Sequence, residues 1–65
     1  MPSSVIRHFD YDPQQRELAV LFVSGRRYRY HEVPEELFRE MRQAFSKGEF
    51  FNGRIRDRFS FTQEH

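Results

Sequence analysis

The sequence contains one unbroken apolar run, Leu18 to Val23, in a chain of 65 residues of which 32% are charged. Six residues is the length of a strand, and three of the six are β-branched or aromatic, which favours a strand over a helix. A strand with one solvent face alternates apolar and polar residues, but this run is apolar throughout. It therefore predicts a central strand that is buried on both faces, or that is covered on one face and makes contacts with the other.

Turn signals on both sides of this run define its neighbours. Asp12-Pro13 predicts a turn, because proline fixes φ and an aspartate side chain accepts hydrogen bonds from backbone amides two residues on. Residues 4–11 before it alternate imperfectly, which suits an edge strand. Residues 26–32, after the glycine that follows the run, form the third predicted strand.

The loop at Gly25 decides which side chains share a face of the sheet. A three-residue loop with Gly25 in the left-handed conformation places Val20 opposite Tyr28 and Leu18 opposite Tyr30. A two-residue loop would set the neighbouring arginines beside the apolar residues, because a slip of one residue exchanges the two faces. We therefore predict the three-residue loop, with both tyrosines in the core and the arginines outside.

The middle of the chain predicts a helix. It begins at Pro34, because proline suits the first helical position and two glutamates follow it. The apolar stripe of this helix consists of Leu37, Met41, Ala44 and Phe45. Gly48 would end the helix as a left-handed cap, or Ser46 would cap a short second helical turn, so residues 46–53 are either helix or loop.

Residues 54–62 alternate again and predict a fourth strand, paired with the first or the third. Its three arginines would then share one face, whereas a helical turn at residues 54–58 would scatter them. The order β-β-β-α-β predicts a small α+β domain, with a bent antiparallel sheet and one helix packed on its aromatic face. By analogy of fold, a small Sm-like or SH3-like barrel is the related alternative.

Length and composition limit the class of protein. The chain makes one domain, residues 1–65, which we expect to be ordered over about 4–62. It has no cysteine to form disulfides, but eight Phe and three Tyr can build a core. It has no apolar stretch long enough for a membrane span and no signal peptide, so we expect a cytoplasmic protein that contacts no membrane.

The sequence offers no catalytic, metal or cofactor site. Its histidines are far apart, and no nucleophile, base and orienting group can be assembled around them. No nucleotide-binding or metalloprotease motif is present, and Asp10 and Asp12 lack the further ligands of a calcium loop. We therefore predict a protein that is not an enzyme and that uses no metal or cofactor.

Arginine is the residue type that suggests a ligand, although the net charge is only +1. Arginines at alternate strand positions lie about 6.5–7 Å apart, a spacing similar to that of phosphates in a single strand of RNA. The candidate nucleic-acid-binding residues are Arg27, Arg29, Arg54, Arg56 and Arg58. Ordinary solvated strand faces would have the same pattern. The aromatic residues Tyr28, Tyr30, Phe50 and Phe51 would either stack on bases or fill the core.

Two blocks of the sequence are specific enough to indicate a relationship. The first is Leu18-x-Val20-x-Phe22-x-x-Gly25-x-x-Tyr28-x-Tyr30-x-x-Val33-Pro34, and the second is Ala44-x-Ser46-x-Gly48-x-Phe50-Phe51-Asn52-x-x-Ile55-Arg56. With Ser4 and Tyr11-Asp12, these residues resemble the KTSC domain family over about residues 4–59. That family occurs as short bacterial proteins and as an extension of some lysyl-tRNA synthetases. The resemblance therefore implies contact with RNA by association, and it implies no established activity.

We expect a small binding module, and two functions remain open. The first is binding of RNA, either tRNA or a single strand, through the arginine rows. The alternative is a protein-interaction or self-association module that uses the second apolar face of strand 18–23, namely Ala19, Leu21 and Val23. A continuous arginine patch would favour the first function, and an apolar patch of several hundred Å² would favour the second.

Overall fold

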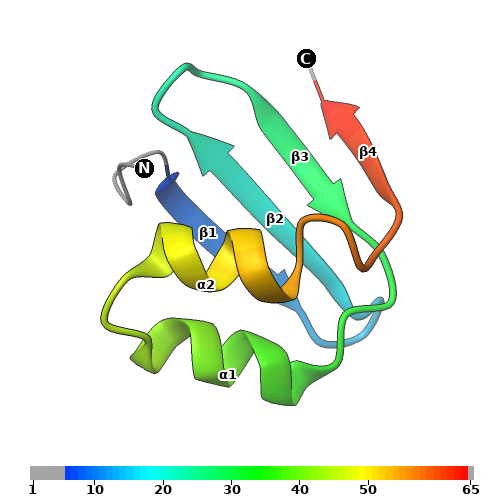
Figure 1. Cartoon of the computed structure of the whole chain (residues 1–65). Coiled ribbons are helices and arrows are strands. Elements are labelled where there is room, and N and C mark those ends of the chain that lie inside the picture. The colour runs from blue at the N-terminus through cyan, green and yellow to red at the C-terminus, as the bar shows by residue number, and fades with distance from the viewer. Residues whose placement is uncertain (1–5, 65) are drawn as a thin grey trace.

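A computed structural model describes residues 6–64 as a four-stranded antiparallel sheet with two helices (Figure 1). The elements are β1 (Ile6–Asp12), β2 (Glu17–Phe22), β3 (Arg27–Tyr30), α1 (Glu35–Gln43), α2 (Lys47–Arg54) and β4 (Phe61–Glu64). The predicted α+β fold is confirmed, with a second helix before the last strand. Residues 4 and 5 of the predicted first strand lie outside the described residues.

The sheet is open, with strand order β1-β2-β3-β4, so it does not form the small closed barrel given as an alternative. The last strand pairs with the third rather than with the first. The turn between β1 and β2 is formed as expected, because the Asp12 carboxylate accepts a hydrogen bond from the amide of Gln14 (3.0 Å). The sheet therefore has β1 and β4 at its two edges.

The hairpin of β2 and β3 has the predicted register. Its pairs include Leu18 with Tyr30 and Val20 with Tyr28. The amide of Phe22 donates to the carbonyl oxygen of Arg26 (2.9 Å), which leaves residues 23–25 as a three-residue loop. Gly25 has φ +93°, a backbone conformation in which a Cβ atom would cause steric strain and which glycine adopts freely. The predicted loop is therefore confirmed.

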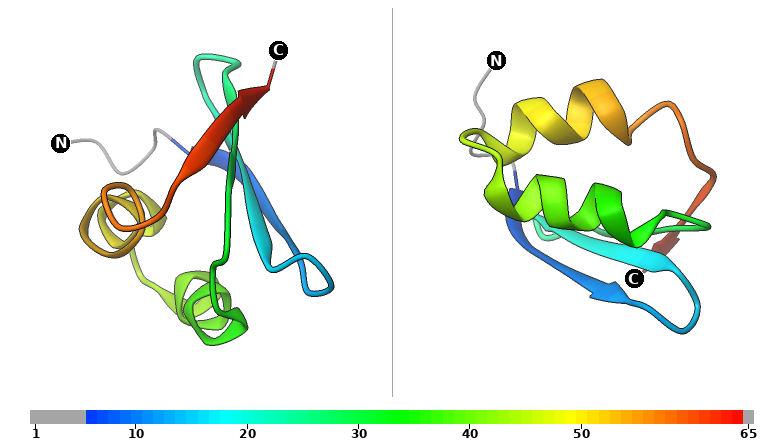
Figure 2. Two further views of the ribbon diagram at one scale, coloured as in Figure 1. Left: turned by 90° about the vertical axis from the view of Figure 1, so that its right-hand side faces the viewer. Right: turned by 90° about the horizontal axis from the view of Figure 1, so that it is seen from below.

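Both helices lie on the same face of the sheet (Figure 2). The buried core consists of Leu18, Val20, Tyr30, Val33, Met41, Phe51 and Ile55. The central strand is therefore covered on one face only. On the other face Ala19 and Leu21 are half-buried, and no helix of residues 6–64 lies above them (Figure 2).

Residues 46–53 are helical, which decides between the two predicted alternatives. The Ser46 hydroxyl caps α2 by accepting a hydrogen bond from the amide of Glu49 (3.3 Å). Gly48 lies inside α2, so the interpretation of Gly48 as a left-handed cap is wrong. Burial of Phe51 stabilises this helix in spite of its two glycines.

The predicted strand over residues 54–62 is also wrong, because a turn follows α2 and β4 begins only at Phe61. Ile55 is fully buried, and the amide of Arg56 donates to the carbonyl oxygen of Phe51 (2.9 Å). These contacts hold the turn against the end of α2. The alternating pattern of this segment therefore arises from a helix end and a turn, and its arginines do not share a strand face.

The apolar stripe of α1 is shorter than predicted. The helix ends before Ala44, whose backbone is extended, so Phe45 leaves the stripe and is fully exposed. Phe38 packs on the sheet instead, with its ring centroid 5.9 Å from that of Phe9 and 5.0 Å from that of Tyr11. Placing Phe45 in the core was therefore wrong, because the prediction extended the helix by two residues.

Candidate functional site

Five aromatic side chains, contributed by β2, β3, α2 and β4, form one cluster. They are Phe22, Tyr28, Tyr30, Phe51 and Phe61. The first four rings close a cycle in which neighbouring centroids are 5.3 to 6.4 Å apart. Phe61 lies 5.3 Å from both tyrosine rings and is 52% exposed, so solvent reaches the cluster on this side.

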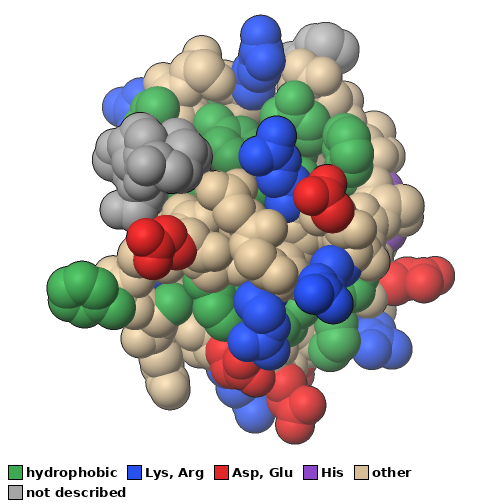
Figure 3. Space-filling model, viewed as in Figure 1, with side chains coloured by type: hydrophobic (Ala, Val, Ile, Leu, Met, Phe, Trp, Pro, Cys, Tyr) green, Lys and Arg blue, Asp and Glu red, His purple; other side chains and the backbone are tan. Residues whose placement is uncertain are grey.

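The exposed side of the cluster forms one wall of a cleft of about 530 Å³, which we call the aromatic cleft. The rest of its lining is mainly polar: Val23, Ser24, Arg26, Asn52, Arg56 and Asp57. Val23 is 59% exposed and, like Phe61, contributes apolar surface to the cleft. Figure 3 shows hydrophobic side chains at the surface above the helices, with basic and acidic side chains beside them.

Local structure places the charged residues at this cleft. Arg26 follows the hairpin loop, where its amide donates to the Ser24 hydroxyl (3.5 Å). Arg56 and Asp57 follow the buried Ile55 in the turn that leaves α2. The cleft is therefore lined by two arginines from separate segments, and an acid lies next to one of them.

Some polar groups of the cleft have no protein partner among residues 6–64. The hydroxyls of Tyr28 and Tyr30 and the side-chain amide of Asn52 make no hydrogen bond to these residues, whereas the Tyr11 hydroxyl donates to the carbonyl oxygen of Val33 (2.6 Å). Every buried side-chain nitrogen or oxygen in the described chain has a hydrogen-bond partner. The three unpaired groups are therefore accessible atoms in the lining of the cleft, where a ligand could bond to them.

The charged residues of the cleft form no ion pair with residues 6–64. Neither Arg26 nor Arg56 pairs with a carboxylate there, and Asp57 pairs with no cation. Burial raises the pKa of the Tyr30 phenol, Tyr28 and Asp57 raise it further, and Arg56 opposes them. The Tyr30 hydroxyl is therefore a neutral hydrogen-bond donor at pH 7.

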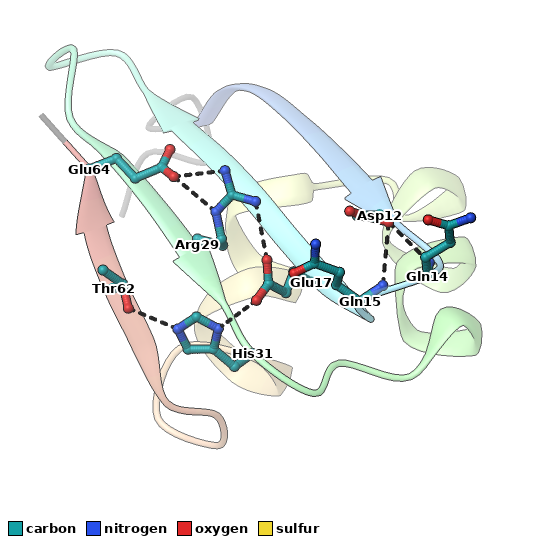
Figure 4. Close-up of polar contacts among 8 residues, drawn as sticks. All are labelled: Asp12, Gln14, Gln15, Glu17, Arg29, His31, Thr62 and Glu64. Atoms are coloured by element: carbon teal, nitrogen blue, oxygen red, sulfur yellow. Dashed lines mark hydrogen bonds and ion pairs between the residues drawn. The ribbon is translucent and has the colours of Figure 1, made fainter.

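The predicted arginines do not lie on one surface. Arg27 and Arg29 belong to β3, Arg54 ends α2, and Arg56 and Arg58 lie in the turn after it. Arg29 is on the uncovered face of the sheet, held between Glu17 (3.1 Å) and Glu64 (2.7 Å), as Figure 4 shows. Arg54 pairs with Glu40 of α1 (3.2 Å). The structure thus brings only Arg56 of the predicted set to the aromatic cleft.

The uncovered face carries a polar network that the sequence analysis missed. His31 Nδ1 is 3.0 Å from Glu17 Oε2, and His31 Nε2 is 2.9 Å from the Thr62 hydroxyl (Figure 4). The bonds from His31 and then from Arg29 hold the pKa of Glu17 below its usual value. Glu64 lies in β4, which extends beyond residue 62, where the predicted strand and the predicted ordered region ended. The sequence contained a signal for this network: extending the predicted register of β2 and β3 by one pair places Glu17 opposite His31.

No group of three or more His, Cys, Asp or Glu in the described part of the chain is arranged to hold a metal ion. None of the helices described is long and apolar enough to cross a membrane.

Comparison with known proteins finds relatives that match nearly all of the chain. A protein of Tsukamurella paurometabola is 44% identical over 57 residues, which cover 88% of this chain and 85% of that protein. A lysine–tRNA ligase of Nostoc punctiforme is 38% identical over 60 residues, which cover 92% of this chain but 11% of the ligase. This chain therefore corresponds to one small part of the ligase.

A solved structure supports the fold. The crystal structure of a KTSC domain protein from Yersinia pestis matches with a TM-score of 0.90 and 36% sequence identity, covering 100% of this chain and 92% of that one. The profile of the KTSC domain matches residues 2–59. The chain therefore belongs to the KTSC domain family.

Proposed function

We propose that this domain is a non-catalytic module that binds single-stranded RNA in the aromatic cleft. One observation carries the proposal: the exposed ring of Phe61 and the half-buried ring of Tyr28 share a cleft with two arginines that pair with no carboxylate of residues 6–64. Modules that bind single strands combine these two elements, aromatic faces for the bases and positive charge for the backbone.

The aromatic wall supplies the stacking surface. Phe61 and Tyr28 are accessible from the cleft, while Tyr30 and Phe51 behind them are buried and support them. Stacking of a base on an aromatic side chain contributes about 1–3 kcal/mol and is available to every base. A cleft of about 530 Å³ is within the range of small-ligand sites, which hold about 300–1,000 Å³. It therefore suits one or two unstacked nucleotides.

The arginines supply the backbone contacts. A guanidinium group binds a phosphate with two parallel hydrogen bonds, and Arg26 and Arg56 are free to do so. Arg58, in the same turn as Arg56, is exposed but does not line the cleft. Arg29 and Arg54 already hold carboxylates, and Arg27 is on the other face of the sheet. We therefore assign Arg56, with Arg26, the main role among the candidate arginines.

The relatives agree with an RNA ligand. Two proteins that contain a matching segment are lysine–tRNA ligases, enzymes that by name act on tRNA. The matching segment covers 11% of each ligase, so it is an addition to a much larger protein. A small module that contacts RNA would serve such an enzyme, and it would serve equally as a separate protein.

The test compares two arginine variants that remove the same charge. Arg56→Ala should weaken binding of a fluorescent uridine heptamer, and should reduce the slope of log K against log salt by about 0.7, the value for one lost phosphate contact on a single strand. Arg39→Ala is the matched control, because Arg39 is exposed on α1 and pairs with Glu35 (3.1 Å). Equal loss of affinity in both variants, or no binding by the wild type at about 50 mM salt, would contradict the proposal.

Self-association remains the second candidate function. Ala19 and Leu21 line a shallow hollow of about 290 Å³ on the uncovered face, but two acids, a histidine and one arginine share it. Val23 lies at the aromatic cleft instead. The three apolar residues therefore do not form one patch. Light scattering at high protein concentration tests this function, and a Leu21→Glu variant that converts a dimer to a monomer would support it.

A further inference from the structure

We propose that the aromatic cleft selects guanine, through paired hydrogen bonds from the base to the Asp57 carboxylate. This inference rests on the proposed function, because it assigns the base that the RNA presents to the cleft. Phosphate binding does not explain one feature of the cleft: an acid, Asp57, follows Arg56 in the lining of a site otherwise suited to an anion.

A carboxylate at a phosphate site weakens binding unless it has a partner of its own. Asp57 is exposed, and it forms neither an ion pair nor a hydrogen bond with the residues described by the structure. Asp57 lines the aromatic cleft together with Tyr30 and Phe61. The cleft therefore offers an acceptor beside the surface on which a base would stack.

The chemistry of the four bases decides which of them fits this acceptor. An ionised carboxylate only accepts hydrogen bonds, and its two oxygens accept two of them side by side. Guanine is the only one of the four whose Watson–Crick edge carries two adjacent donors, the ring N1–H and the exocyclic amino group. The other three bases place an acceptor next to each donor on that edge, and this lone pair would face a carboxylate oxygen.

The O6 carbonyl of guanine, which Asp57 does not bind, can accept a hydrogen bond from other residues of the cleft. The carbonyl O6 of guanine is an acceptor on the same edge, next to N1–H. The side-chain amide of Asn52 and the hydroxyl of Tyr30 are donors that line the cleft and make no hydrogen bond to residues 6–64. Single-stranded RNA is read in this way, by stacking on the base and hydrogen bonds to its edge.

The experiment compares heptamers that differ in one base, UUUGUUU and UUUUUUU, and a third with inosine at the centre, which lacks the exocyclic amino group. We expect wild-type protein to bind UUUGUUU about tenfold more tightly than UUUUUUU, as one bidentate base contact gives, and to bind the inosine heptamer with intermediate affinity. A single guanine in uridine avoids quadruplex formation.

The variant Asp57→Asn should abolish the preference for guanine while retaining, or improving, the affinity for UUUUUUU, because it removes a negative charge near the phosphates. Glu36→Gln, an exposed acid in the first turn of α1, is the matched control and should keep the preference. The isosteric change at Asp57 is on the surface, so the Asp57→Asn variant should unfold at the temperature of the wild type.

The outcomes separate this inference from the proposed function. Binding of both heptamers with equal affinity, or a guanine preference that survives Asp57→Asn, overturns the inference and leaves RNA binding in place. Tighter binding of a central adenine or cytosine also overturns it. If no heptamer binds, both the inference and the proposed function are overturned.

Discussion

Replacing Gly25 with alanine tests the loop on which the register of the sheet depends. At φ +93° an alanine side chain is strained, at a cost of about 1–2 kcal/mol. No atom lies within 4 Å of the position that the Cβ would occupy, so steric contact adds nothing. Alanine also lowers the conformational entropy of the unfolded chain, which raises the free energy of unfolding by about 0.4–1 kcal/mol. The net prediction is a loss of stability of about 1 kcal/mol.

Gly53→Ala is the matched control, because it makes the same chemical change with the opposite expected sign. Gly53 lies inside α2, and no atom is within 4 Å of its Cβ position either. Alanine is preferred over glycine in a helix by roughly 0.5–1 kcal/mol, so this variant should be more stable than the wild type. The two substitutions differ only in the backbone conformation that each residue must adopt.

Thermal unfolding followed by circular dichroism measures both variants. A change of 1 kcal/mol shifts Tm by about 4–8 °C in a domain of this size. We therefore expect Gly25→Ala to lower Tm by about that amount, and Gly53→Ala to raise it by several degrees. Equal shifts of the same sign would refute the reasoning, and a stabilising Gly25→Ala would show that the loop is not left-handed at this residue.

Two further predictions concern stability. The lowered pKa of Glu17 stabilises the folded state above the usual value of 4.5, and this contribution is lost as the pH falls through the lowered value. Wild-type Tm should therefore fall more between about pH 6 and pH 3 than the Tm of Glu17→Gln, and parallel curves would contradict this. Phe45→Ser should change stability by less than about 0.5 kcal/mol in urea titrations, because Phe45 is fully exposed, whereas Phe51→Ala should cost about 3–5 kcal/mol. A large loss at Phe45 would show that this residue is covered.

The first half of the fold was predictable because strong local signals agree there. A glycine after an unbroken apolar run, with tyrosines at alternate positions beyond it, permits only one register that keeps charges out of the core. The turn at Asp12 and the start of the helix near Pro34 follow from side-chain chemistry that acts over two or three residues. Such signals do not depend on the rest of the chain.

The second half was not predictable from local signals. The residues of α2 include two glycines and an asparagine, which are poor helix formers, and the helix exists because Phe51 and the following Ile55 are buried against the sheet. The sequence left residues 46–53 open as helix or loop, and the alternation beyond them was interpreted as a strand. Tertiary burial, which the sequence pattern does not display, decides this segment.

The candidate site was predicted in part for the same reason. Four of the residues singled out as possible ligand contacts line the aromatic cleft: Tyr28, Tyr30, Phe51 and Arg56. Arg26 and Asp57 were not singled out. They line the same cleft because the turn after α2 lies beside the hairpin of β2 and β3, which local sequence signals do not predict. Ion pairs also determine which arginines are free to bind a ligand. Arg29 is paired with Glu17 and Glu64, and these pairs can be predicted only when the register of β2, β3 and β4 is known.

The central claim is that RNA binds on the aromatic side of the hairpin and not on the uncovered face of the sheet. Amide chemical shifts of the labelled protein, recorded by NMR during titration with UUUGUUU, test it most directly. The account predicts that the shifted amides cluster at residues 23–28 and at 52–57, with little change at Ala19, Arg29 and Thr62. Shifts centred on those last three residues, or no shifts at all, would contradict it.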